Sequence, residues 1–188
     1  MPMTQLDVRK EYSIWLLPYG SNNEKLSEII SKLSKRFSHS HQTPKFEPHV
    51  TLIGQIKANE KEVIKKVEDL ASCTEPFHLK LGNTEHSENY FKCLFAQVEN
   101  AHELAKIRKN AEESFCCHEP YFPHLSIMYG LFSTEEREAL TREMGNLELS
   151  LDIRKTAVYL TSGSTERWNC IATFDLGCLP RRMSKLDN

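Results

Sequence analysis

The sequence lacks a long apolar run that could cross a membrane or serve as a signal peptide. The segment 1–12 includes Asp7, Arg9, Lys10 and Glu11, and charged side chains of this kind are costly in a bilayer. We therefore expect a cytoplasmic protein with no membrane partner.

The sequence also lacks a Cys-x-x-Cys pair among its six cysteines. That spacing is typical of zinc ribbons and of redox motifs, so neither class of site is indicated. We expect reduced thiols, no metal site and no cofactor.

An excess of charge of one sign is absent as well. The chain has 24 Lys and Arg residues against 26 Asp and Glu residues, which gives a formal charge of −2. Proteins that hold a long nucleic acid use a positive field that displaces counterions from the phosphates. We therefore expect no stable nucleic-acid partner, whereas a small phosphate ligand is compatible with this balance.

What is present is the composition of a folded globular chain. Hydrophobic residues make up 39% and charged residues 27% of the 188 positions. This length and composition suit one compact body with a buried core. We expect a single domain over residues 1–188, and a monomer.

Hydrophobic periodicity predicts strands that interleave with helices. Apolar runs predict strands at 12–17, 49–54, 77–81, 90–98, 124–130, 149–160 and 168–176, and helical stripes fall at 26–37, 59–70, 101–115 and 133–144. Strands and helices alternate twice without a low-complexity linker. The pattern predicts an α+β fold with two pseudo-symmetric lobes, largely antiparallel sheets lining a central cleft, and helices outside.

Two segments share the plan Pro-His-apolar-hydroxyl-apolar. The first contains His49 and Thr51 within FEPHVTLIG, and the second contains His124 and Ser126 within PYFPHLSIMYG. Residues i and i+2 of a strand point to the same face, so each segment would present an imidazole together with a hydroxyl. If the two lobes face each other, these four groups converge on one cleft.

Such a group of side chains suits the cleavage of a phosphodiester. One imidazole can take a proton from water while the other gives a proton to the departing oxygen, because both titrate near neutral pH. The hydroxyls of Thr51 and Ser126 can hold the phosphoryl oxygens by donating hydrogen bonds. No metal is needed for this chemistry.

The pair of motifs is more specific than either motif alone. A single histidine on a strand is more often a satisfied core or edge residue, and His41 with Thr43 has the same spacing without a strand pattern. Two matched copies, each preceded by proline and each in an apolar strand, favour a catalytic role for His49 and His124.

On these motifs the sequence resembles the two-histidine (2H) phosphoesterase superfamily, and within it the cyclic phosphodiesterases of plants and yeast. YSIWLLP, YFKCLF and WNCIATFDL are also similar to segments of those enzymes, in the same order. The resemblance implies a bilobal α+β fold. It also implies hydrolysis of ADP-ribose 1″,2″-cyclic phosphate, to the 1″-phosphate, and of nucleoside 2′,3′-cyclic phosphates to 2′-phosphates.

The resemblance also assigns roles to particular residues. We assign His49 as the acid and His124 as the base, an assignment that can be exchanged. Tyr129 matches a tyrosine that lines the family's phosphate site, and it stands where the RNA-directed branch commonly has arginine. Trp15 and Phe122 are candidates for stacking on a nucleobase, with core packing as the alternative for each.

Two other functions stay open at this point. One is a 2H enzyme that acts on RNA, either as a 2′,5′-phosphodiesterase or in 3′-end processing, which would want a basic groove. The other is a catalytically silent nucleotide-binding or scaffold protein with the same fold. Intact histidine-hydroxyl pairs argue against the silent protein.

Overall fold

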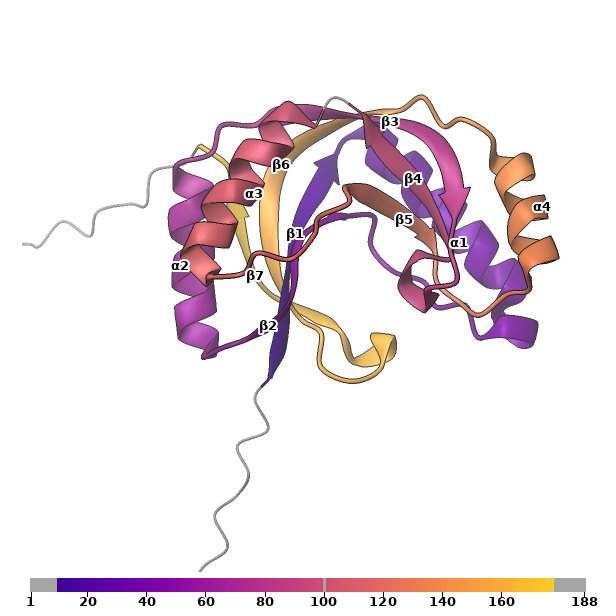
Figure 1. Ribbon diagram of the computed structural model, residues 1–188, viewed down its shortest axis with the longest axis horizontal. Coiled ribbons are helices and arrows are strands. Elements are labelled where there is room, and N and C mark those ends of the chain that lie inside the picture. Colours follow the sequence, from indigo (N-terminus) through magenta and orange to yellow (C-terminus); the bar gives the residue numbers. More distant parts are fainter. Residues whose placement is uncertain (1–9, 100, 178–188) are drawn as a thin grey trace, which may run out of the picture.

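The structure is a computed structural model and describes residues 10–99 and 101–177 (Figure 1). The strands in this part of the chain are β1 (Glu11–Tyr19), β2 (Val50–Lys57), β3 (Phe77–His86), β4 (Leu94–Glu99), β5 (His124–Met128), β6 (Ser150–Leu160) and β7 (Asn169–Asp175). The helices are α1 (Ser21–His41), α2 (Glu60–Ser72), α3 (His102–Phe115) and α4 (Thr134–Met144), with short 3-10 turns η1 (Tyr90–Lys92) and η2 (Thr165–Arg167).

All strands join one antiparallel sheet in the order β1-β2-β5-β4-β3-β6-β7. Strand β1 also pairs with β6, so the first six strands in this order form a closed ring of pairings and β7 extends from β6. The expected α+β class with antiparallel pairing is confirmed. The parts of the sheet that belong to the two lobes are hydrogen-bonded to each other through the long strands β1 and β6.

The helices lie outside the sheet in two groups. Helices α2 and α3 pack on β2, β6 and β7, whereas α1 and α4 pack on β3, β4 and β5 and on parts of β1 and β6. Figure 1 shows these groups at opposite ends of the molecule, with the strands curving between them. Fully buried side chains such as Leu26, Val67, Leu104 and Leu140 join each helix to the core. Burying apolar side chains of this size contributes about 1.5–3 kcal/mol each.

The expected strand at 90–98 begins later than predicted. Residues Tyr90–Lys92 form the turn η1, and the strand β4 starts at Leu94. The Asn89 side chain accepts a hydrogen bond from the Phe91 backbone, and the Ser87 hydroxyl donates to the Lys92 carbonyl. These local side-chain bonds stabilise a turn where the apolar pattern alone favoured a strand.

Helix α4 begins as the sequence predicts. The Ser133 hydroxyl accepts from the Glu136 backbone while the Glu136 carboxylate accepts from the Ser133 backbone, which completes a capping box. The loop between β5 and α4 therefore ends at Ser133. This loop carries Tyr129, which matters for the site described next.

Candidate active site

A single register pair places all four motif side chains on one face of the sheet. Val50 of β2 lies opposite Leu125 of β5, and both side chains are fully buried in the core. Neighbours along a strand point to the other face, so His49 and Thr51 share a face with His124 and Ser126. Continuing the antiparallel register by one residue on either side would put His49 opposite Ser126 and Thr51 opposite His124.

Both histidines are held in the same tautomer by the same local device. The Nδ1 of His49 lies 2.6 Å from the Glu47 carbonyl, and the Nδ1 of His124 lies 2.8 Å from the Phe122 carbonyl. A carbonyl oxygen only accepts, so each Nδ1 carries the hydrogen and each Nε2 presents a lone pair. The residue between each histidine and its carbonyl is a proline, whose fixed φ restricts this turn of the chain.

His49 is enclosed by aromatic rings. Its imidazole is 4% exposed and stacks on Trp15, with ring centroids 3.6 Å apart and an interplanar angle of 6°. Tyr159 stacks on Trp15 at the same centroid distance of 3.6 Å, so it covers the opposite face of the indole. The Tyr159 hydroxyl donates a hydrogen bond to the side-chain carboxylate of Glu47. The backbone carbonyl of the same Glu47 accepts the hydrogen bond from His49.

This arrangement corrects the expectation for Trp15. With 3% exposure and both faces covered by His49 and Tyr159, the indole has no free face for a nucleobase. Its place is behind the His49 imidazole. The sequence could not show which neighbours occupy the two faces of Trp15, because they come from other strands.

The surroundings lower the pKa of both histidines. Burial lowers the pKa of His49 to about 4. The hydrogen bond to the Glu47 carbonyl opposes this shift, whereas the charge of His124 lowers the pKa further. Burial is also the main cause of the lowered pKa of His124, to which the charge of Lys92 adds. Because the charge of His124 lowers the pKa of His49, the two imidazoles are close enough to interact electrostatically.

The other predicted phosphate-binding residues lie around the two imidazoles. Tyr129 is buried, stacks on Phe46 at 3.8 Å, and its hydroxyl lies 3.5 Å from the Nε2 of His49. Burial raises the pKa of this phenol, which keeps it a neutral donor. The Ser126 hydroxyl donates to the Phe91 carbonyl at 2.8 Å, so its hydrogen must be redirected if it is to bind a phosphate.

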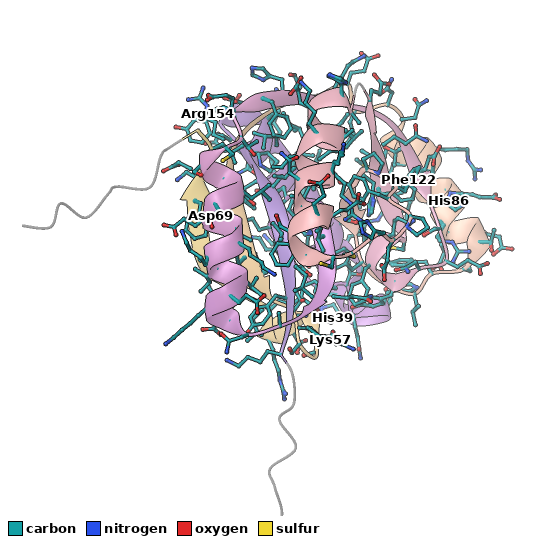
Figure 2. All side chains as sticks on the ribbon, turned by 60° about the vertical axis from the view of Figure 1, so that its left-hand side comes forward. His39, Lys57, Asp69, His86, Phe122 and Arg154 are labelled. Carbon is teal, nitrogen blue, oxygen red and sulfur yellow. The ribbon has the colours of Figure 1, made fainter. Side chains whose placement is uncertain are left out.

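A cavity of about 230 Å³ opens beside His124 and Thr51. Phe122 and Lys92 also line this cavity, which we call the His124 cavity. Phe122 (Figure 2) is 46% exposed, and its ring centroid lies 6.0 Å from that of His124. Phe122 therefore keeps an accessible aromatic surface at the entrance to the site, which is compatible with the predicted stacking role.

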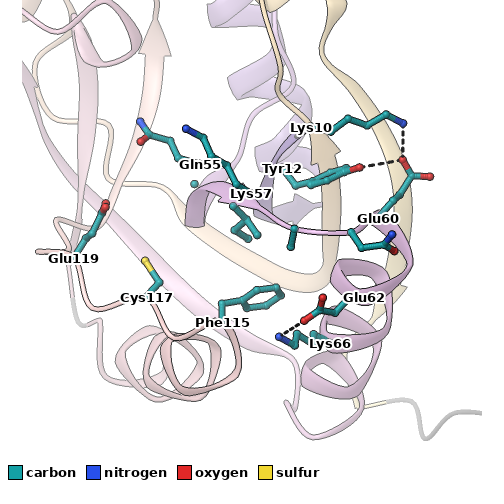
Figure 3. A pocket seen from close by; sticks show the side chains of 14 residues that line it. Lys10, Tyr12, Gln55, Lys57, Glu60, Glu62, Lys66, Phe115, Cys117 and Glu119 are labelled. Carbon is teal, nitrogen blue, oxygen red and sulfur yellow. Dashed lines mark hydrogen bonds and ion pairs between the residues drawn. The ribbon is translucent and has the colours of Figure 1, made fainter. Parts of the chain in front are cut away.

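A larger hollow of about 920 Å³ lies next to this cavity and is lined by neither His49 nor His124. Figure 3 shows it between the end of β2, the start of α2 and the end of α3. Gly54, Cys117 and Glu119 line both spaces. The size of this hollow does not make it the reaction site, because it lacks an imidazole to move protons.

Three residues near the site were missed by sequence reasoning. Lys92 is the one charged residue of the aromatic segment YFKCLF, and that contrast could have drawn attention to it. Trp168, whose ring lies 5.3 Å from that of Phe91 and 6.1 Å from that of Trp15, was not distinguished from other strand aromatics. Tyr159 reaches Glu47 from a position 112 residues away in the chain, and no local pattern signals such a contact.

Residues 10–99 and 101–177 hold no group of three His, Cys, Asp or Glu side chains placed to bind a metal ion. The five cysteines within these ranges are free thiols, and Cys178 lies outside the described residues. None of the described helices has the length and apolar character needed to span a bilayer.

Comparison with known proteins gives consistent matches. The family model for "Cyclic phosphodiesterase-like protein" matches residues 11–178. The cyclic phosphodiesterase of Arabidopsis thaliana is 24% identical over 181 residues, which cover 90% of this chain and 98% of that protein. The 2′,3′-cyclic-nucleotide 3′-phosphodiesterase of Yarrowia lipolytica is 29% identical over 143 residues, which cover 71% of this chain and 63% of that protein.

Solved structures share the fold at low sequence identity. The protein TT0787 of Thermus thermophilus aligns with a TM-score of 0.60 and 13% identity over 89% of this chain and 98% of that chain. The E. coli protein LigT in complex with 3′-AMP aligns with a TM-score of 0.58 and 12% identity, over the same shares of 89% and 98%. The bilobal fold expected from the sequence is therefore the fold of these structures.

Proposed function

We propose, on the premise that this chain belongs to the cyclic phosphodiesterase-like protein family of the 2H phosphoesterase superfamily, that it hydrolyses small 2′,3′-cyclic phosphates. Membership in the family makes the chain a phosphodiesterase. The finer proposal is that the substrate is a nucleoside 2′,3′-cyclic phosphate or ADP-ribose 1″,2″-cyclic phosphate. The products are the 2′-phosphate and the 1″-phosphate respectively, and no metal takes part.

The observation that carries this proposal is the shared face of the two motifs. Val50 of β2 pairs with Leu125 of β5, which supports a shared face for the motif side chains on either side of this pair, and both imidazoles have Nδ1 at a backbone carbonyl. An acid and a base on either side of one phosphoryl group are the minimum for hydrolysis of a cyclic diester. Thr51, Ser126 and Tyr129 are the hydroxyl donors that we propose for the phosphoryl oxygens.

The electrostatics favour the reverse of the roles assigned from sequence. Burial lowers the pKa of His49 to about 4, so at pH 7 this imidazole is neutral and its Nε2 has the lone pair that a base needs, whereas His124 is only partly buried and can be protonated from the solvent. We therefore assign His49 as the base that takes a proton from water through Nε2. The resulting hydroxide forms a bond to phosphorus, the bond from phosphorus to the 3′ oxygen breaks, and that oxygen takes the proton that His124 carries on Nε2 when its imidazole is protonated.

The experiment is hydrolysis of 2′,3′-cyclic AMP by the purified protein in excess chelator, with the isomer of the product identified. We expect 2′-AMP, and a loss of turnover of about 10³-fold in both His49→Ala and His124→Ala. Formation of 3′-AMP, activity that needs added metal, or near wild-type turnover in either variant would overturn the proposal.

The pH dependence of the residual activity tests the two roles. In His49→Ala the remaining group is the acid His124, so residual activity should fall as the pH rises through the pKa of His124. In His124→Ala the base remains, and activity should instead rise with pH through the pKa of His49. If activity instead rose with pH in His49→Ala and fell with pH in His124→Ala, His49 would be the acid and His124 the base, as assigned from the sequence.

The charges around the larger hollow bear on the RNA-directed alternative. Lys10, Lys57 and Lys66 line the hollow, and they pair with Glu60, Glu11 and Glu62 at 3.1, 3.1 and 2.7 Å. A track for an RNA backbone needs positive charge that is available to phosphates. These pairings support the small substrate over the polymer.

A further inference from the structure

Lys92 places a positive charge inside the His124 cavity. It lies at the end of η1, is partly buried, and lines the cavity together with Thr51, His124 and Phe122. Its ammonium lies 5.3 Å from the centre of the Phe122 ring and 5.6 Å from that of Phe95. Two aromatic faces therefore hold the cation in position at the cavity wall.

No carboxylate of the described residues forms an ion pair with Lys92, in contrast to the lysines of the larger hollow. Lys66 offers a close comparison, because its ammonium also lies over an aromatic ring, that of Phe115 at 5.2 Å, but it pairs with Glu62 at 2.7 Å. Figure 3 shows this pair and the pair of Lys10 with Glu60. A cation held partly out of water without a counter-charge attracts an anionic ligand.

The position of Lys92 relative to the two histidines identifies which anion it meets. The reacting phosphoryl group of the proposed function lies between His49 and His124. The His124 cavity is lined by Lys92, Thr51 and His124 but not by His49. Lys92 therefore faces a space on the His124 side of the site, where a part of the substrate other than the reacting phosphate would lie.

We propose that Lys92 binds a second phosphate group of the substrate, so that the site prefers cyclic phosphates that carry another phosphoryl or pyrophosphoryl group. This inference rests on the proposed function, since it places the reacting phosphate between the two histidines. It makes Lys92 a specificity-determining residue. The aromatic rings of Phe95 and Phe122 position its ammonium.

The test compares adenosine 2′,3′-cyclic phosphate with the same compound bearing a 5′-phosphate. The wild-type protein should have a kcat/KM about tenfold higher for the 5′-phosphorylated substrate, mainly through a lower KM, as expected for one charge-assisted contact. Lys92→Met should reduce this ratio to about one, and Lys92→Arg should keep most of it. Lys66→Met, the matched control, should keep the wild-type ratio, and added salt should weaken the preference in every protein that shows it.

Three outcomes would overturn the inference. They are a wild-type protein without preference, a Lys92→Met variant that keeps the preference, and a Lys66→Met variant that loses it as well. The basic limb of the pH profile provides a second readout. The charged or titratable groups that face His124 are His49 and, in the cavity, Lys92, Arg108, Cys117, Tyr121 and the exposed Glu119. Loss of the Lys92 charge should move this limb to higher pH.

Failure of the proposed function would be recognised separately. If neither compound is hydrolysed, the hydrolytic proposal fails, and the dissociation constants of the two compounds measured by titration calorimetry still test Lys92. Tighter binding of the 5′-phosphorylated compound that disappears in Lys92→Met would support the anion subsite. Equal binding would refute it.

Discussion

His49 and His124 have the same motif and the same backbone contact, yet their surroundings differ. His49 lies against Trp15 beneath the site, whereas His124 borders an open cavity and the cation of Lys92. Tautomer and orientation come from the Pro-His segments, which are local in sequence. The difference in burial comes from residues on other strands, and the two roles that we propose rest on this difference.

Tyr159 is expected to position His49 without touching the substrate. Its ring supports Trp15 and its hydroxyl donates to Glu47, whose carbonyl fixes His49. Tyr159→Phe removes that hydrogen bond, so the imidazole is held less firmly and kcat should fall by about tenfold with little change in KM. Steady-state kinetics with 2′,3′-cyclic AMP would measure the effect.

Tyr12 provides the control for that substitution. It is also a buried tyrosine that donates to a glutamate, Glu60 at 3.2 Å, but it lies by the larger hollow. Tyr12→Phe should leave kcat at the wild-type value. Equal losses in the two variants would mean that Tyr159 acts only through general stability. Glu47→Gln, which retains an acceptor for the tyrosine, should rescue most of the kcat lost in Glu47→Ala.

At the scale of elements, α3 fixes the approach to β5. Arg108 of α3 is buried and donates to the Leu52 carbonyl of β2, to the Glu119 carbonyl and to the Glu112 carboxylate. Its guanidinium also lies over the Tyr121 ring, at 4.6 Å from the ring centre. The segment 116–123 is therefore held against β2 just before it delivers His124 to the site.

Arg108→Met should affect both stability and activity. The substitution leaves the Leu52 carbonyl and the Glu112 carboxylate without their donor, and we expect the free energy of unfolding to fall by about 3 kcal/mol. Because His124 follows the freed segment, kcat should also decrease at temperatures where the protein remains folded. Chemical denaturation and kinetics on the same preparation would measure both quantities.

Arg137 of α4 is the matched control, since it is buried and donates to the Phe132 carbonyl, in the loop after β5 and not in the segment 116–123 that precedes His124. Arg137→Met should destabilise the protein in a similar way while the folded fraction keeps its kcat. A normal kcat in Arg108→Met would show that the segment 116–123 needs no clamp to place His124.

The elements also show what the sequence could predict. Helix α4 and strands β6 and β7 follow from capping and apolar periodicity, and the histidine-hydroxyl pairs follow from period-2 alternation. The turn at Tyr90–Lys92 was missed because side chains of Ser87 and Asn89 override an apolar pattern. The contacts of Trp15 and Tyr159 depend on which strands become neighbours, and no window of sequence contains that information.

At the scale of the whole molecule, the pairing of β1 with both β2 and β6 joins the two lobes into one sheet. Trp15 of β1 lies within this junction, so the burial of His49 depends on the assembly of strands from both ends of the chain. Folding therefore buries the His49 imidazole, which is easily protonated in the unfolded chain. The stability of the protein must then depend on pH through His49.

The sign of this dependence follows from the lowered pKa. Between pH 4 and 6.5 the unfolded chain binds a proton at His49 that the folded protein does not bind, so stability rises with pH in this window and is fully present above it. The difference between the two ends of the window is about 3 kcal/mol for a pKa that moves from 6.5 to about 4. Urea denaturation at a series of pH values would measure it.

Two variants make that measurement specific to His49. His49→Gln removes the titrating group and keeps an amide able to donate to the Glu47 carbonyl, so the rise in stability between pH 4 and 6.5 should shrink by about 3 kcal/mol. His78→Gln changes an exposed histidine on β3 and should leave the wild-type pH dependence intact. If His49→Gln kept the full dependence, the imidazole would have to be reached by water in the folded protein. The assignment of His49 as the neutral base would then lose its physical cause, since burial is the main reason that its pKa is low.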